Sequence, residues 1–333
     1  MTDYTSAGVD LGRAASAKSR ILAAARTTFG PRVLTDVGHF GGFFALDDSP
    51  SGQVLVASMD GVGTKVLLGH QLGKIDGLGK DLVHHSINDI LMCGATPLFF
   101  LDYMAFGRIS PDIAATLAES FASACRHHGV ALLGGETAEM PDLYSPDHFD
   151  LAGTIVGIVR RDHMLEGKGV SPGDVLLGVR SSGLHTNGYS LARKVFENDI
   201  MTGDVKRRSL RDGRSIAQAL MEPHRCYLPA LGPLIGNPGL HALSHITGGG
   251  IEENTMRVLP KPCHLEIDWE SWTRPEIFQI LQSRGEVPES EMRKVFNLGI
   301  GVIAIVDRQE SERIAAEIRN RGEEVYEIGQ VIS

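Results

Sequence analysis

The stretch VLVASMDGVGTK, residues 54–65, joins a short apolar run to a glycine-rich turn. Its first six residues favour a buried strand, and the Asp60-Gly61 pair after them is a turn signal. The pattern therefore predicts a strand that delivers Asp60 to a loop. Glycines in such a loop let backbone N–H groups approach an anion, and Lys65 could neutralise that anion. The spacing matches neither a Walker A loop nor a GxGxxG fingerprint.

Helical and strand patterns alternate through the rest of the first half of the chain. Apolar residues recur at helical spacing over residues 78–91, which places Asp89 inside a helix. Ser110-Pro111 is typical of a helix start, and the helical pattern continues to about residue 129. Buried strands are predicted at residues 98–104, 130–133 and 151–159, the second of which ends at the glycine turn GGET. The first half is therefore expected to be mixed β and α.

The polar stretch RRDHMLEGKGVSPG, residues 160–173, is the best candidate for a domain boundary. A chain of 333 residues has the length of about two domains. We expect an N-terminal domain over residues 1–165 and a C-terminal domain over residues 166–333. After the boundary, strands are predicted at 175–179, 240–246, 264–267, 299–306 and 324–332, and helices at 189–197, 251–258, 275–284 and 309–321.

The composition excludes several classes of protein. A formal net charge of -9 disfavours a protein that lives on nucleic acid or on an anionic membrane. The longest apolar stretches are too short to span a membrane, and the N-terminus lacks the apolar core of a secretory signal, so we expect a cytoplasmic protein. The cysteines form no CxxC pair, which argues against a zinc site and a disulfide framework. An anionic ligand would therefore need backbone amides or metal ions.

Three acidic residues, Asp60, Asp89 and Glu136, are placed beside glycine-rich turns by the predicted elements. Apart from Lys65, no basic residue stands immediately beside them. Carboxylates without counter-charges repel each other unless a hard divalent cation bridges them, and Mg²⁺ combines few carboxylates with phosphate oxygens. If the three acids converge, a magnesium–nucleotide site explains them. Taken singly, each is better explained as a turn or helix-capping residue.

The loop GLHTNG, residues 183–188, lies between a predicted strand and a predicted helix. A helix N-terminus presents free N–H groups, so this loop is a candidate seat for a ligand phosphate. His185 could donate to that phosphate or move a proton near neutral pH, with a surface loop histidine as the alternative. Residues 247–250, TGGG, repeat the order of strand, glycine loop and helix, with a tight helix entry as the alternative.

Further histidines offer no metal motif by their spacing: His84, His85, His127, His128, His241 and His245. Adjacent histidines on a helix point to different faces, and the segment between His241 and His245 lacks the glutamate of HExxH. We therefore expect these side chains to be structural. No GxSxG elbow is present, so the sequence does not support a hydrolase of that type.

Five motifs in series resemble one family. They are DGVGTK (60–65), NDI with GATPLFFLDY (88–103), GGETAEMP (134–141), GLHTNGYSLAR (183–193) and ITGGGIEEN with RVLP (246–260). In this order, and in a chain of this length, they resemble the phosphoribosylformylglycinamidine cyclo-ligases, also called aminoimidazole ribonucleotide synthetases. The resemblance extends from about Tyr4 to the C-terminus.

The resemblance implies an activity and a fold. The activity is ATP-dependent ring closure of formylglycinamidine ribonucleotide to 5-aminoimidazole ribonucleotide in purine biosynthesis, with Mg²⁺ required, a monovalent cation left open, and ADP and phosphate released. Phosphoryl transfer to the formamide oxygen gives an iminophosphate, which the amidine nitrogen then attacks. The implied fold is α/β (α+β), with two mixed α/β domains, strands of the first pairing across a homodimer into a barrel, and the active site in the cleft between domains.

The resemblance also implies roles for individual residues. The catalytic set is His185, Asp60 and Asp89, and the metal ligands are Asp60, Asp89 and Glu136. The implied ATP-binding residues are Gly41, Gly42, Asp60, Gly61, Gly63, Thr64, Lys65, Asp89 and Glu136. The implied substrate-binding residues are His185, Thr186, Asn187, Gly248 and Gly249.

Departures and alternatives accompany the resemblance. The glycine loop GHFGG, residues 38–42, carries His39 where the family is more uniform, and Leu22 stands where family members can carry a lysine. Selenophosphate synthetases, of the same superfamily, would carry an early reactive cysteine, whereas the first cysteine here is Cys93. Thiamine monophosphate kinases would not show GLHTNGYSLAR and ITGGG in this form. A non-catalytic nucleotide-binding regulator would keep the glycine loops but lose the three acids.

Overall fold

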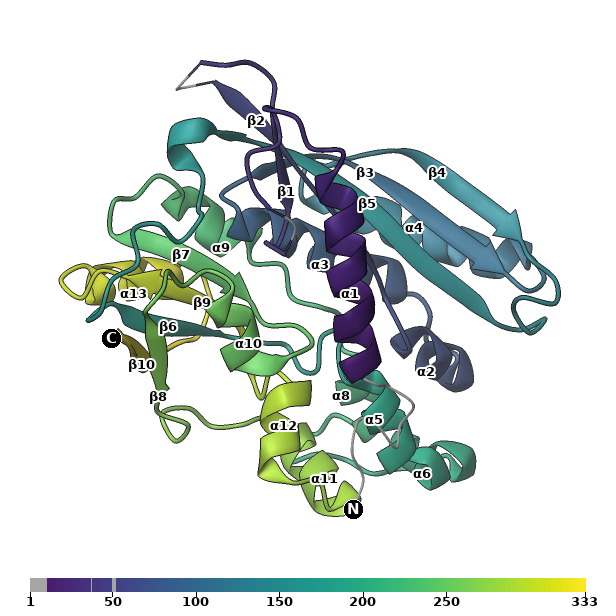
Figure 1. The fold of residues 1–333 in the computed structure, drawn as a ribbon. Coiled ribbons are helices and arrows are strands. Elements are labelled where there is room, and N and C mark those ends of the chain that lie inside the picture. The colour runs from purple at the N-terminus through teal and green to yellow at the C-terminus, as the bar shows by residue number, and fades with distance from the viewer. Residues whose placement is uncertain (1–10, 37, 50–51) are drawn as a thin grey trace.

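Two five-stranded sheets, one from each half of the chain, organise the molecule (Figure 1). The computed structural model describes residues 11–36, 38–49 and 52–333. Within these ranges no helix is both long enough and apolar enough to cross a membrane. The expected mixed fold of helices and sheets is confirmed.

The first sheet has the strand order β1-β2-β5-β3-β4. Its neighbouring strands are antiparallel except for β3 and β4, which are parallel. Along β5, buried and half-buried residues alternate strictly, because successive side chains of a strand point to opposite faces. One face of the sheet is therefore core and the other is partly open. The strands are β1 (Gly42–Ala45), β2 (Gln53–Gly61), β3 (Thr96–Phe106), β4 (Ala131–Glu139) and β5 (Phe149–Arg160).

The core face of the first sheet is covered by α3 (Leu78–Met92) and α4 (Pro111–His127). Phe121 of α4 is fully buried, and its ring lies 6.1 Å from that of Phe100 on β3. The apolar face predicted for α4 therefore packs on the sheet, as the helical spacing indicates. The N-terminal helix α1 (Leu11–Arg26) and the short α2 (Lys65–Leu72) complete this half.

The second sheet is antiparallel throughout, with the order β7-β9-β6-β10-β8. Its central strand β9 is buried at every position, so it reads as the continuous apolar run IGVIAIV. The strands are β6 (Val175–Arg180), β7 (Leu240–His245), β8 (His264–Ile267), β9 (Ile300–Val306) and β10 (Val325–Ile332). The helices are α5 (Tyr189–Val195), α6 (Glu197–Thr202), α7 (Asp204–Arg207), α8 (Ile216–Leu220), α9 (Leu228–Leu231), α10 (Gly250–Met256), α11 (Glu276–Gly285), α12 (Glu289–Val295) and α13 (Ser311–Asn320).

Helix α3 lies between the two halves. It packs on β2, β3 and β5 of the first sheet and on β7 and α9 of the second half. As a result it is buried on nearly all sides, including its polar side chains. A buried polar group needs a hydrogen-bond partner, so these side chains must find theirs across the boundary between the halves.

Several local expectations are corrected by the structure. Strand β4 continues through the glycines of GGET to Glu139, so Glu136 lies in a strand and not in a turn. Asp60 likewise lies inside β2, one residue before its end. Ser110 precedes α4 as predicted, but its side chain makes no capping hydrogen bond. Elements without a clear local pattern were not predicted, namely β1, α2, α6 to α9 and α12.

Candidate active site

Helix α3 directs a row of polar side chains at the second half of the chain. Asp81, His85 and Asp89 follow at intervals of four, which puts them on one face of the helix. All three are buried. Next to them, the Asn88 amide group donates to the carbonyl of Arg225 at 2.8 Å and accepts the backbone N–H of Tyr227 at 2.9 Å. The helix thereby fixes a loop of the second half against the first.

His85 lies between the two carboxylates that the sequence selects. Its Nε2 lies 2.8 Å from Oδ2 of Asp60 and 3.7 Å from Oδ2 of Asp89. Burial alone would lower the pKa of His85, but attraction to the two carboxylates outweighs it and raises the pKa to about 9. Burial alone would raise the pKa of Asp60, and the same contact lowers it to about 2. A charged imidazole thus holds the acids together.

Asp89 is oriented by two further side chains. The Nδ1 of His245, at the end of β7, lies 2.8 Å from Oδ1 of Asp89. The hydroxyl of Ser58 on β2 donates to Oδ2 at 3.2 Å. Because Asp60 also lies on β2 and its side chain is 45% exposed, an approaching ligand can reach this carboxylate pair from solvent. The pair is therefore a candidate cation site.

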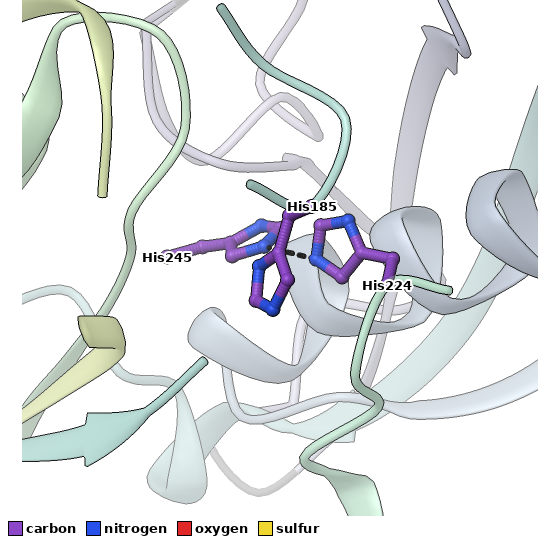
Figure 2. Close-up of side chains that lie close together, drawn as sticks. All are labelled: His185, His224 and His245. Atoms are coloured by element: carbon purple, nitrogen blue, oxygen red, sulfur yellow. Dashed lines mark hydrogen bonds between the residues drawn. The ribbon is translucent and has the colours of Figure 1, made fainter. Parts of the chain in front are cut away.

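Three buried histidines meet beside this pair. Figure 2 shows His185, His224 and His245 converging from three separate segments, with a hydrogen bond of 3.0 Å between the Nε2 atoms of His224 and His245. Burial lowers the pKa of all three, so these rings are neutral at pH 7. His185 lies in the left-handed region, at φ 63°. The predicted loop is present, but the imidazole of His185 is buried and not on the surface.

The geometry of the three histidines does not suit a metal ion. The rings of His185 and His224 are stacked, with centroids 3.9 Å apart and an interplanar angle of 24°. Their in-plane lone pairs therefore run side by side and do not converge on one point. The backbone N–H of Ser182 also donates to Nε2 of His185, so the neutral ring carries its hydrogen on Nδ1. That Nδ1 is buried and has no hydrogen-bond partner among the described residues.

Lys65 is not exposed to a ligand in this structure. Its ammonium group is fully buried and lies 2.8 Å from each carboxylate oxygen of Asp81. It also donates to the backbone carbonyls of His185 at 3.2 Å and Glu222 at 2.8 Å. Burial lowers the pKa of Lys65 and raises that of Asp81, and their mutual attraction opposes both shifts. The lysine predicted to neutralise a phosphate instead joins the two halves.

Other residues of the two predicted loops contact side chains on α5 and α3. The hydroxyls of Thr64 and Ser190 lie 3.2 Å apart, and the hydroxyl of Thr186 lies 2.8 Å from Nδ1 of His85. Asn187 contacts Thr186 through its amide. In the first loop, Gly63 has φ +68°, a conformation that favours glycine. Together with the Lys65–His185 contact, these contacts place the loops DGVGTK and GLHTNG, far apart in sequence, at one site.

The other predicted glycines line two separate cavities. Gly41 and Gly42 border a cavity of about 430 Å³ together with Ser58 of β2. Gly248 and Gly249 border a cavity of about 920 Å³ between α10 and α12. Only the first of these includes a side chain that contacts the carboxylate pair.

Glu136 does not join Asp60 and Asp89 within one chain. Asp60 pairs with Gly153, Gly153 with Asp102, and Asp102 with Gly135, so these residues form one row across the sheet. Glu136 is the next residue along β4, and its side chain therefore points to the opposite face. Three strand spacings, roughly 14 Å, also separate the two strands. The predicted convergence of three acids is wrong for a single chain.

Several site residues were missed or misjudged from the sequence. His85 and His245 were expected to be structural, yet both contact the carboxylates. His224 and Asp81 were not singled out. The spacing of Asp81, His85 and Asp89 on one helix face was a usable signal for the first half. Contacts of His224 and His245 join residues far apart in sequence, and no local pattern carries them.

Two α/β halves, each built on a five-stranded sheet, that meet at a carboxylate–histidine cluster define the class of protein. Two family models match the chain: the N-terminal domain of AIR synthase related proteins matches residues 42–159, and the C-terminal domain matches residues 171–333. The chain belongs to this family. A relative from Sorangium cellulosum, named phosphoribosylformylglycinamidine cyclo-ligase, is 43% identical over 99% of this chain and 95% of its own length. A relative of the same name from Cupriavidus pinatubonensis is 43% identical over 98% and 93%.

Solved structures share the fold at low sequence identity. A protein from Thermus thermophilus has a TM-score of 0.62 and 18% identity, over 94% of this chain and 93% of that one. The thiamine-monophosphate kinase of Stenotrophomonas maltophilia K279a has a TM-score of 0.57 and 16% identity, over 93% and 92%. The hydrogenase maturation protein HypE of E. coli has a TM-score of 0.61 and 17% identity, over 92% and 88%. These likenesses show the fold alone.

The buried Lys65–Asp81 pair should be a main support of the fold. We expect Lys65→Met to lower the free energy of unfolding by about 3–5 kcal/mol, because it leaves a buried carboxylate without its partner. The exposed control Lys168→Met should change it by less than about 0.5 kcal/mol. Urea denaturation measures both, and adding Asp81→Leu to Lys65→Met should recover part of the loss. Unchanged stability in Lys65→Met would contradict the structural role.

His85 should make stability depend on pH above neutrality. Its pKa rises from 6.5 to about 9 on folding, so its ion pairs stabilise fully below pH 6.5 and are lost as the pH rises through 9. We expect the difference in unfolding free energy between wild type and His85→Gln to shrink over this range. Urea denaturation in the presence of EDTA tests this without metal. A constant difference would mean that His85 is uncharged in the folded protein.

Proposed function

We propose that this protein is an ATP-dependent cyclo-ligase. It closes formylglycinamidine ribonucleotide to 5-aminoimidazole ribonucleotide in purine biosynthesis and releases ADP and phosphate. The observation that carries the proposal is the match, over nearly the whole chain, to two relatives that bear this enzyme's name. The carboxylate pair and the two ligand loops at one site support it, since a phosphoryl-transfer enzyme works mainly by positioning and charge stabilisation.

Mg²⁺ and ATP fit the carboxylate pair. Asp60 and Asp89 are hard oxygen donors, held in place by His85, His245 and Ser58. Bound there, Mg²⁺ would neutralise ATP phosphates and replace His85 as the main counter-charge of the two acids. The cavity bordered by Gly41 and Gly42 adjoins Ser58 and offers room for a nucleotide.

His185 is proposed to act on the reacting end of the ribonucleotide as a neutral imidazole. Its Nε2 accepts the Ser182 N–H, which leaves Nδ1–H as a donor without an acceptor among the described residues. Such a donor can bind the formamide oxygen while that oxygen is phosphorylated. Thr186 and Asn187 extend the same loop and would hold the neighbouring part of the substrate. Gly248 and Gly249 border a separate cavity, and only the family resemblance supports them as substrate contacts.

Division into domains at about residue 165, a homodimer and a cytoplasmic location belong to the same proposal. The open face of the first sheet supports the dimer, because Phe44, Met59 and Leu101 are 44%, 68% and 38% exposed there. Met59 and Leu101 pair with the same residue, Thr154, and so stand in one row on that face. A second copy would cover this apolar row, form the barrel, and bring a further Glu136 to the face where this chain's own side chain points.

Turnover of the purified protein tests the activity. With formylglycinamidine ribonucleotide, ATP and Mg²⁺, we expect aminoimidazole ribonucleotide and ADP to form in equal amounts. Asp89→Asn should lower kcat/KM at least about 100-fold by removing a charge that holds the metal, while its urea denaturation stays cooperative. The exposed Asp112→Asn is the matched control. ADP without the ring product would move the protein to another activity of the superfamily, and near wild-type turnover in Asp89→Asn would contradict the metal assignment.

The dimer can be tested at its proposed surface. We expect the wild type to sediment as a dimer, and Met59→Glu to sediment as a monomer, because the change puts a charge on the apolar row that the second copy would bury. Met201→Glu is a matched control, since Met201 is 73% exposed on α6, away from the sheet. A monomeric wild type, or a dimeric Met59→Glu, would show that this face is not the interface.

A further inference from the structure

A cavity of about 380 Å³ opens beside the contact between Thr64 of the DGVGTK loop and Ser190 of α5. Ser190, Arg193, Lys194 and Glu197 line it from the α5–α6 segment, and Gln71 lines it from the end of α2. Ser190 lies three and four positions before Arg193 and Lys194, and Glu197 lies four and three positions after them, so the four side chains share one side of that segment. Ser190 is also the residue whose hydroxyl meets Thr64. The cavity therefore adjoins the proposed active site through a direct contact.

Arg193 has an unusual environment within this cavity. Its Nε is buried and has no hydrogen-bond partner among the described residues. Arg193 also forms no ion pair with a carboxylate of the described residues, whereas many other arginines of the chain do. Burial lowers the pKa of Arg193, and attraction to Glu197 opposes that shift only in part. A partly desolvated guanidinium without an acceptor is costly unless an anion binds to it.

The donors around Arg193 suit a phosphate group. A guanidinium offers two parallel N–H groups that match the oxygens of a phosphate, and hydrogen bonds of this kind are charge-assisted. The Ser190 hydroxyl and the Gln71 amide are further donors on the cavity wall. Glu197 is its single acidic side chain among the described residues, so the cavity carries positive charge in a chain whose net charge is -9.

We propose that this cavity binds the 5′-phosphate monoester of the ribonucleotide substrate, with Arg193 as its bidentate partner. The inference rests on the proposed function and extends it. The loop with His185 and Thr186 leads directly into α5. One continuous segment would thus hold the reacting end of the substrate at the histidine and its phosphate at the arginine. The phosphate of ATP is the other source of the same chemistry, and the experiment separates the two.

Substrates with and without the phosphate test the assignment. We expect Arg193→Met to raise the KM for formylglycinamidine ribonucleotide roughly 10- to 100-fold, the range for losing charge-assisted hydrogen bonds. The KM for ATP should stay within about twofold. Arg193→Lys should retain part of the affinity, because it keeps the charge and loses the fork geometry. On the corresponding ribonucleoside, which lacks the phosphate, wild type and Arg193→Met should have equal kcat/KM. The exposed Arg208→Met is the matched control for a lost surface charge.

Binding of ribose 5-phosphate gives a readout that does not need turnover. Calorimetric titration should show binding to the wild type and to Arg208→Met, and at least about tenfold weaker binding to Arg193→Met. A variant that affects nucleotide and nucleoside equally, or that raises the KM for ATP instead, would overturn the proposal. If the wild type binds ribose 5-phosphate through Arg193 but forms no ring product, the phosphate site stands and the proposed function fails. Urea denaturation of Arg193→Met and Arg193→Lys checks that both variants are folded.

Discussion

The buried contact between Lys65 and Asp81 is the constraint on which the site depends. The Lys65 ammonium also donates to the carbonyls of His185 and Glu222, and the Asp81 carboxylate accepts the backbone N–H of His224 at 2.7 Å. One ion pair thus links the first ligand loop, α3 and two segments of the second half. Because both groups are fully buried, neither can leave without stranding the other charge. The halves are therefore held in one fixed relation around the histidines.

The balance between burial and attraction to carboxylates decides the charge of each histidine at the site. His85 is as buried as its neighbours, yet its pKa rises to about 9 because Asp60 and Asp89 lie against it. His84, one residue earlier on α3, contacts a carbonyl and another histidine, and burial lowers its pKa to about 4. His85 is therefore a charged imidazole among neutral ones. That arrangement compensates two acids while it leaves neutral imidazoles next to the substrate loop.

The parts of the fold and of the site that appear as local sequence patterns could be predicted. Strands β2, β5 and β9 and helices α3 and α4 follow from apolar runs and helical periodicity, and the family followed from five motifs in series. The remaining features depend on strand register and on burial, which local sequence patterns do not specify. Glu136 was grouped with Asp60 because both stand near glycines, but the pairing of β3 with β4 turns its side chain to the other face. The contact between Asp89 and His245 joins two residues 156 positions apart, and the periodicity of a single helix or strand cannot predict such a contact.

Lys65 and Arg193 show why a cation near a glycine loop is a weak signal by itself. The sequence favours Lys65 as the phosphate ligand, since it ends the motif DGVGTK. The structure satisfies that ammonium completely with Asp81 and two carbonyls. Arg193 stands in a helix at a cavity wall, and its buried Nε finds no acceptor in the described part of the chain. A charge whose partners are all protein groups holds the fold, whereas a partly buried charge without a partner is available for a ligand. Whether protein groups already pair with the charge, and not how near it lies to a motif, separates a structural cation from a ligand-binding one.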